Sequence, residues 1–208
     1  MTTSSFNALL STQIGNEFTA SQQYIAVATW FANQDLPQLA RYFYRQSVEE
    51  RNHAMMMVQY MLDRDIPFTI PGVPAVRNDF ASVTEPLALA LQQEKEVTRN
   101  IEDLFRAARG ENDALGEQFM LWFLKEQVEE VASMTTLLNI AERADNLFDI
   151  ENFIARETIG AGSLGGGGVP AAVVRCYSGN QGSAPGPPDD GSVPGTRQDW
   201  PKDLPCRG

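Results

Sequence analysis

Apolar residues recur at helical spacing through most of residues 1–159 of the chain. Before residue 34, positions separated by three or four places form one face of a helix: Phe6, Leu9, Leu10, Gln13, Glu17, Tyr24 and Val27. A serine at position 4 or 5 can accept a hydrogen bond from the first helical turn. The pattern therefore predicts a helix that begins near Ser5 and ends near Asn33.

Further helices are predicted from the same spacing and from residues typical of helix ends. The second is expected to run from a cap at Asp35, with Pro37 in its first turn, to about Asp63. Three more are predicted over residues 84–109, 112–142 and 147–157, and Gly110 is expected to end the third helix. The last of them is short and amphipathic, whereas each of the first four would be about 40 Å long.

The lengths of the connections predict how these helices are arranged. Short joints at residues 33–35 and 110–112 force two antiparallel hairpins. The connection from Asp65 to Val83 contains three prolines and is long enough to cross the length of a bundle. It is expected to bring the third helix back beside the second. The sequence thus predicts an all-α four-helix bundle with one long crossover and a short fifth helix.

The composition changes at about residue 160. Positions 160–208 hold 12 of the 16 glycines and 7 of the 12 prolines, and such a segment has little apolar surface to bury. We therefore expect a helical domain over residues 1–159 and a flexible tail over residues 160–208. Acidic and basic residues balance in this tail, so the net charge of −11 lies in residues 1–159.

The charge and the apolar pattern exclude several classes of protein. A strongly acidic chain is a poor general binder of nucleic acid and is suited to cationic partners. No apolar run reaches the roughly 18 residues of a membrane span, and the first residues lack the basic and apolar regions of a secretory signal. The two cysteines form neither a disulfide framework nor a spaced zinc site. We expect a soluble, cytoplasmic protein without nucleic-acid or membrane partners.

Candidate chemistry begins with Glu50 and His53, which lie on one face of the second helix. A Glu-x-x-His pair is common by chance, but His53 is the only histidine in the chain. Polar residues also repeat between the two hairpins at one constant offset in residue number. The offset relates Glu17 to Glu94, Glu49 to Glu126, Glu50 to Gln127, and His53 to Glu130.

In a bundle of two related hairpins, these equivalent positions face each other across the core. Any one of the residues alone could be an ordinary solvated or hydrogen-bonded side chain. Together they would place several carboxylates in an apolar interior, where they cannot all be ionised without a cation. Oxygen ligands with one imidazole and no thiolate suit iron or manganese. The repeat therefore predicts a buried metal site.

At these residues the chain resembles the prokaryotic ferritins, over about residues 5–158. The resemblance rests on Asn16-Glu17-Phe18-Thr19-Ala20 with Tyr24, on Glu49-Glu50-Arg51-Asn52-His53-Ala54, on Glu94, on Gly116-Glu117-Gln118-Phe119 with Trp122, and on Glu126-Gln127-Val128-Glu129-Glu130. It implies a ferroxidase site in which Glu17, Glu50 and His53 hold one iron. Glu50 would bridge to a second iron, held by Glu94 and Glu130.

The resemblance also assigns residues around this pair. Gln127 would be a nearby hydrogen-bonding residue, and a third iron position of bacterial ferritins maps onto Glu49, Glu126 and Glu129. Tyr24 shares a helix face with Glu17. Its hydroxyl could hold a ligand carboxylate or donate an electron, although an ordinary core role explains the residue equally well.

The chain departs from the haem-containing bacterioferritins, which carry Glu-x-x-His on both hairpins. Its second hairpin reads Gln127-x-x-Glu130, and Arg51 and Asn52 stand where a haem-ligating methionine would be expected. We therefore predict that the chain binds no haem. The methionines at residues 55–57 are expected to be packing residues.

The resemblance implies a protein that oxidises Fe(II) with O2 or peroxide and stores Fe(III) as a mineral in a cage of 24 identical subunits. An alternative is a di-metal enzyme of the manganese catalase or oxygenase type that does not store iron. Asp113 and Glu117 could line an entry pore, but we favour a role at the helix end. Residues 160–165 resemble peptides that load cargo into encapsulin shells, although we favour a plain linker there.

Overall fold

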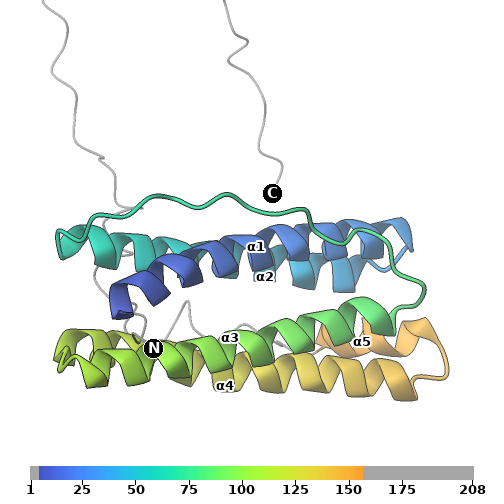
Figure 1. The fold of residues 1–208 in the computed structure, drawn as a ribbon. Helices are drawn as coiled ribbons and strands as arrows, with labels where there is room; N and C mark the ends of the chain where they lie inside the picture. The colour runs from blue at the N-terminus through green and yellow to red at the C-terminus, as the bar shows by residue number, and fades with distance from the viewer. Residues whose placement is uncertain (1–4, 157–208) are drawn as a thin grey trace, which may run out of the picture. The chain divides into compact units, whose positions relative to one another are not determined.

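The computed structural model describes residues 5–156 of the chain, and every regular element among them is an α-helix (Figure 1). The helices are α1 (Phe6–Asn33), α2 (Pro37–Asp63), α3 (Thr84–Gly110), α4 (Ala114–Arg143) and α5 (Leu147–Arg156). The predicted domain boundary after residue 159, the predicted flexible tail and the stretch at residues 160–165 lie outside the described residues. No helix of the described part is both long and apolar enough to cross a lipid bilayer.

Two antiparallel hairpins, α1–α2 and α3–α4, lie face to face, and the long connection runs along the length of the first (Figure 1). This confirms the predicted four-helix bundle with one crossover and a short fifth helix. The expected neighbour of the third helix was wrong. Helix α3 packs against α1, while α2 faces α4 through contacts such as the stacked rings of Tyr60 and Phe119, with centroids 4.3 Å apart.

The crossover is held against α1, which explains why it delivers the chain beside that helix. The buried amide of Gln23 donates to the Arg77 carbonyl at 2.7 Å and accepts from the Arg77 backbone N–H at 2.8 Å. Pro71 lies so close to Gly15 that an added Cβ at Gly15 would be 2.9 Å from the proline Cγ. A side chain at residue 15 would therefore push the crossover off the helix.

The start of α2 differs from the sequence expectation. Asp35 does not cap the helix, because it lies in the turn with a left-handed φ of 58° that a short-chain polar residue tolerates. Leu36 takes the cap position and offers no side-chain hydrogen bond. The carboxylate of Glu151 in α5 accepts from the backbone N–H groups of Gln38 and Leu39 at 2.8 and 2.9 Å instead. Helix α5 thus supplies the cap that the local sequence lacks.

The joint between α3 and α4 also differs in detail. Gly110 is the last residue of α3 rather than the residue that ends it, and Asn112 is the left-handed residue, with φ 57°. Helix α4 begins at Ala114, directly after Asp113, which caps it by accepting from the Gly116 N–H at 3.1 Å. The left-handed residues of the two hairpin turns, Asp35 and Asn112, are related by the same offset as Glu17 and Glu94.

The core consists of two apolar clusters, one toward each end of the bundle. One contains Phe31, Phe43 and Leu137, and the other contains Phe6 and Met61. Met56 and Met57 are buried in this second cluster and Met55 packs against it, which confirms the packing role of the methionines. On each of the four long helices, the buried acidic residues lie between the segments that contribute to the two clusters. A polar layer therefore crosses the middle of the bundle.

Replacement of Gln23 by methionine preserves the shape of the side chain and removes both of its hydrogen bonds to the crossover. We expect the free energy of unfolding to fall by about 1–2 kcal/mol, because the Arg77 backbone groups lose their partner. A chain of this size should then unfold about 2–8 °C lower. Thermal unfolding followed by circular dichroism measures the shift, and an unchanged midpoint would show that the two Gln23 hydrogen bonds do not stabilise the fold.

Candidate metal centre

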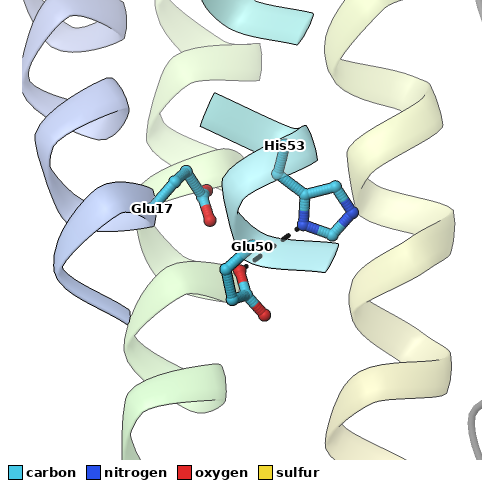
Figure 2. Close-up of side chains that lie close together, drawn as sticks. All are labelled: Glu17, Glu50 and His53. Carbon is cyan, nitrogen blue, oxygen red and sulfur yellow. Dashed lines mark ion pairs between the residues drawn. The ribbon is translucent and has the colours of Figure 1, made fainter. Parts of the chain in front are cut away.

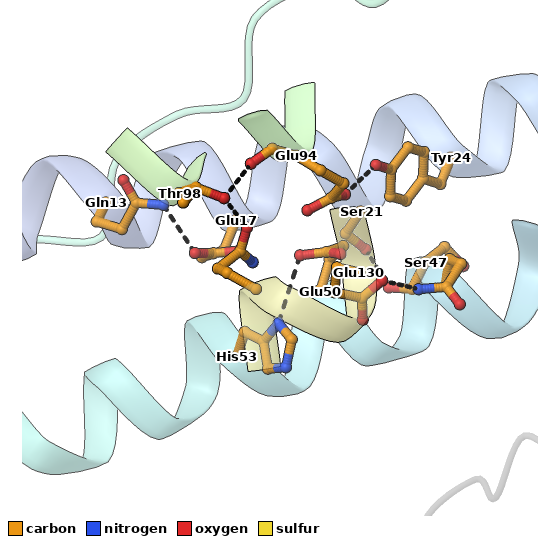
Figure 3. A network of polar contacts seen from close by, with 12 residues as sticks. Gln13, Glu17, Ser21, Tyr24, Ser47, Glu50, His53, Glu94, Thr98 and Glu130 are labelled. Carbon is orange, nitrogen blue, oxygen red and sulfur yellow. Dashed lines mark hydrogen bonds and ion pairs between the residues drawn. The ribbon is translucent and has the colours of Figure 1, made fainter. Parts of the chain in front are cut away.

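The polar layer gathers side chains from all four long helices (Figure 3). Each of its central members is at most 6% exposed: Glu17 on α1, Glu50 and His53 on α2, Glu94 on α3, and Gln127 and Glu130 on α4. The interior position predicted for these residues is therefore observed. Apolar clusters on both sides keep water from this layer, so its polar groups must find their partners within it.

Three of these residues form a group with the spacing of metal ligands. One ligand atom from each of Glu17, Glu50 and His53 lies within 4.8 Å of the others (Figure 2). The His53 Nδ1 is 3.5 Å from Glu50 Oε2. Trp122 and Phe123 on α4 hold the imidazole ring edge-on, with centroids 5.7 and 5.6 Å away. Two helices of the first hairpin thus provide the ligand atoms, and the second hairpin orients the ring.

Glu94 and Glu130 bring two more carboxylates to the same layer (Figure 3). The hydroxyl of Tyr24 donates a hydrogen bond to Glu94 Oε1, so this tyrosine contacts the predicted site across the bundle. Burial raises the pKa of Glu50 well above its usual range, and the charges of Glu94, Glu17 and Glu130 raise it further. Glu50 is therefore close enough to each of the other three carboxylates to be repelled by it.

Several oxygens of this group have no hydrogen-bond partner. Glu17 Oε2, Glu50 Oε1 and Glu94 Oε2 are fully buried, and none of them is hydrogen-bonded within the described residues. A buried polar atom without a partner costs roughly 1–3 kcal/mol, and more if it is charged. A cation placed among them would satisfy all three at once. The donor set, oxygens with one imidazole, fits the iron or manganese expected from the sequence.

The protonation of the layer is consistent with an ion that displaces protons. Burial raises the pKa of Glu17, Glu130 and Glu94, the last to about 7, so these acids hold protons more tightly than an exposed glutamate. Burial lowers the pKa of His53 to about 4, so its imidazole is neutral at neutral pH. A neutral imidazole can bind a metal directly, whereas each carboxyl group must lose its proton when the metal enters.

A second group of the same kind adjoins the first. Ligand atoms of Glu49, His53 and Glu126 also lie within 4.8 Å of one another. Burial, and then the charge of Glu126, raises the pKa of the half-buried Glu49 to about 7. Glu129 is exposed, yet its charge raises the pKa of both Glu49 and Glu126. The three acids predicted to form a third metal position are therefore neighbours, with Glu129 on the solvent side.

Asp113 and Glu117 are paired at the end of the bundle. Asp113 lies 2.6 Å from Arg64 while it caps α4, and Glu117 lies 3.0 Å from Arg109. Both contacts are consistent with the helix-end role that we favoured. A pore lined by these residues would involve neighbouring subunits and stays a prediction.

Sequence reasoning missed three residues that hold the site. Gln13 donates to Glu17 Oε1 at 2.7 Å, Gln46 donates to Glu130 Oε2 at 3.0 Å, and the Thr98 hydroxyl lies 3.0 Å from Gln127 Oε1. The two glutamines share a pattern that could have revealed them. Each lies one helical turn before a buried glutamate, on the same helix face, since Gln13 precedes Glu17 and Gln46 precedes Glu50.

The fold and the layer define a class: four-helix bundles that place carboxylates and histidine in their interior to hold metal ions. The family model described as a ferritin-like domain matches residues 7–144. This chain belongs to the ferritin family.

Named relatives agree with this placement. The chain is 62% identical over 159 residues to "Ferritin BfrB" of Mycolicibacterium smegmatis, and this match covers 76% of this chain and 88% of the relative. It is 35% identical over 134 residues to "Bacterial non-heme ferritin" of Staphylococcus aureus, and this match covers 64% of this chain and 81% of the relative. A solved open-pore ferritin from Archaeoglobus fulgidus matches with a TM-score of 0.69 at 24% identity. The match covers 73% of this chain and 95% of the solved chain, and it supports the fold.

The raised pKa values predict how pH affects the metal-free protein. A buried acid binds its proton more tightly in the folded chain than in the unfolded chain, so stability falls as pH rises through the folded pKa. Glutamates of the unfolded chain lose their protons near pH 4.5, whereas Glu94 and Glu49 keep theirs up to a pKa of about 7, so their contribution to stability falls between these two values. The lowered pKa of His53 has the opposite effect, but only below its unfolded value of 6.5. Because the two glutamates outweigh the one histidine, thermal unfolding in a chelator should show a midpoint that decreases between about pH 5 and 7.

The variant Glu94→Gln is the control for this pH dependence. The amide cannot ionise, so the fall in midpoint should be smaller than in the natural chain. A midpoint that is constant or rises between about pH 5 and 7 would contradict the raised pKa values.

Proposed function

We propose that this chain is an iron-storage ferritin that oxidises Fe(II) at a pair of positions inside each subunit. The observation that carries the proposal is the set of unpartnered carboxylate oxygens from α1, α2 and α3 that lie buried beside a neutral histidine. The names of the relatives, ferritin and non-heme ferritin, support iron as the metal. Iron is here the substrate, since it enters as Fe(II) and leaves as Fe(III).

Each residue of the layer has a role in this proposal. Glu17, Glu50 and His53 hold the first Fe(II), and their ligand atoms already lie within 4.8 Å of one another. Besides burial, the charges of Glu94, Glu17 and Glu130 all raise the pKa of Glu50. In this proposal Glu50 bridges to a second Fe(II), which Glu94 and Glu130 hold. The Thr98 hydroxyl, 3.0 Å from Gln127 Oε1, holds Gln127 in the same layer. Carboxylates are hard ligands that stabilise Fe(III) more than Fe(II), and this favours oxidation.

The electrons and protons of the reaction balance with two irons. Each Fe(II) gives up one electron, and one O2 takes both together with two protons to form hydrogen peroxide. With peroxide as oxidant, the two electrons and two protons give two water molecules. In the metal-free protein, burial raises the pKa of both Glu17 and Glu50, so these acids hold protons more tightly than exposed glutamates. Their protons are released when iron replaces them.

Tyr24 and the second group of acids complete the proposed path. The Tyr24 hydroxyl fixes one oxygen of Glu94 and leaves the other for iron. Donation of an electron by Tyr24 stays a prediction. Glu49, Glu126 and Glu129 form a third iron position between the buried pair and solvent, and His53 belongs to both groups. Iron that leaves the pair would pass through this position.

Storage requires a cavity, which only an assembly of subunits provides. Large apolar side chains are exposed on the outer faces of the helices, among them Val48 on α2, Val128 on α4 and Phe148 on α5. Such side chains are typical of surfaces that other copies cover. We propose a homo-oligomeric cage, with 24 subunits as expected from the resemblance. A cytoplasmic location, the absence of haem and the absence of nucleic-acid or membrane partners stay predictions. The resemblance of residues 160–165 to peptides that load cargo into an encapsulin shell also stays untested.

The double substitution Glu50→Ala with His53→Ala removes the bridging carboxylate and the imidazole. Rapid Fe(II) oxidation should fall to the rate of free Fe(II), because both proposed positions lose a ligand. Stopped-flow absorbance after mixing with aerobic Fe(II) measures the rate. Glu102→Ala, which removes an exposed acid paired with Arg106, is a matched control and should oxidise Fe(II) normally. A double variant as fast as the natural chain would contradict the proposal.

The native mass, together with the iron content after aerobic loading, distinguishes storage from the di-metal enzyme considered above. A ferritin should give a particle of many subunits with far more than three irons per chain. Light scattering and elemental analysis of the same fraction measure both quantities. A small particle that keeps two metal ions per chain would instead support the enzyme.

A further inference from the structure

Gln46 lies in the polar layer, but the proposed function gives it no role. Its side chain is 1% exposed, on the α2 face that looks toward α4. The amide Nε2 donates to Glu130 Oε2 at 3.0 Å. This contact joins α2 to α4 and holds one oxygen of the Glu130 carboxylate.

Glu130 holds the second iron in the proposed function, and its side chain is buried. The Gln46 amide holds one of its oxygens, Oε2. A neutral donor can fix this carboxylate without adding a cation that competes with the metal.

The internal repeat shows that an amide is not required at this place by the fold. The offset that relates His53 to Glu130 also relates Gln46 to Phe123. The contacts are equivalent too, since Gln46 touches Glu130 and Phe123 packs edge-on against His53. The same place in the two hairpins thus holds an amide opposite a carboxylate and a phenyl ring opposite an imidazole.

This difference follows the chemistry of the residue that is supported. A phenyl edge packs well against a neutral imidazole, but opposite Glu130 it would leave a buried carboxylate oxygen without a donor. We propose that Gln46 is a positioning residue of the iron site, whose amide fixes the Glu130 carboxylate and so sets where its remaining oxygen points. The inference rests on the proposed function. It adds that binding of the second iron depends on an uncharged residue that touches no metal.

The test replaces Gln46 by methionine, which has a similar shape and no N–H donor. Co(II) is the probe, because it takes oxygen and nitrogen ligands, is not oxidised by air in this setting and reports its coordination by visible absorption. The metal-free full chain is titrated with Co(II). Loss of a supporting hydrogen bond at a metal site typically weakens metal affinity by about 10- to 100-fold. We expect the second Co(II) per subunit to bind weaker by that factor.

Gln23→Met provides the matched control. Gln23 is also a buried glutamine, but its two hydrogen bonds go to the backbone of the crossover. This variant should unfold at a lower temperature and bind Co(II) like the natural chain. If Gln46→Met does not fold, as judged by circular dichroism, Gln46→Asn keeps the amide and withdraws it by one methylene, and the same weakening is expected.

The outcomes separate this inference from the proposed function. If the double substitution Glu50→Ala with His53→Ala leaves Co(II) binding as it is in the natural chain, both the proposed function and the role of Gln46 are overturned. Normal binding in the natural chain and equal binding in Gln46→Met would overturn the role of Gln46 alone. Equal weakening in Gln46→Met and Gln23→Met would show that the effect comes from general destabilisation, and it would overturn the positioning role as well.

Discussion

The structure depends on a conflict between carboxylates and the dry interior that surrounds them. Glu17, Glu50, Glu94 and Glu130 lie in one layer, with an apolar cluster on either side along the bundle. Without a cation, the conflict is relieved by protons, as the raised pKa values of these acids indicate. A metal ion relieves it more completely, because it also satisfies the unpartnered oxygens. The free-energy cost of burying the acids is thus relieved when the ion binds, and this relief adds to the affinity for the ion.

The repeat of two hairpins explains how such a layer can form. It relates four pairs of polar positions in the two hairpins and repeats even the left-handed turn residues, Asp35 and Asn112. The supporting residues break the symmetry. Gln13, Tyr24 and Gln46 belong to the first hairpin, and their counterparts in the second are Ala90, Ile101 and Phe123. The ligands therefore follow the repeat, while most of the groups that orient them are particular to one half.

Much of the fold was predictable because its signals are local. Helix spacing and short joints gave the hairpins, and the predicted ends of the four long helices lie close to the observed ones. The errors came from contacts distant in sequence. Asp35 was expected to cap α2, but the cap comes from Glu151, at the other end of the described chain. The third helix was placed beside α2, but Gln23 and Gly15 hold the crossover against α1.

For the site, the sequence by itself determined which acids and which histidine face the interior, because the constant offset between the hairpins and the helical period fix each residue's face. Only the tertiary structure decided which oxygen of each acid is held and which has no partner. That choice depends on donors from other helices, such as Tyr24 to Glu94 and Gln46 to Glu130. Whether a hydrogen bond forms depends on differences of a few tenths of an ångström in the distance between groups on neighbouring helices. No pattern along a single helix contains that information.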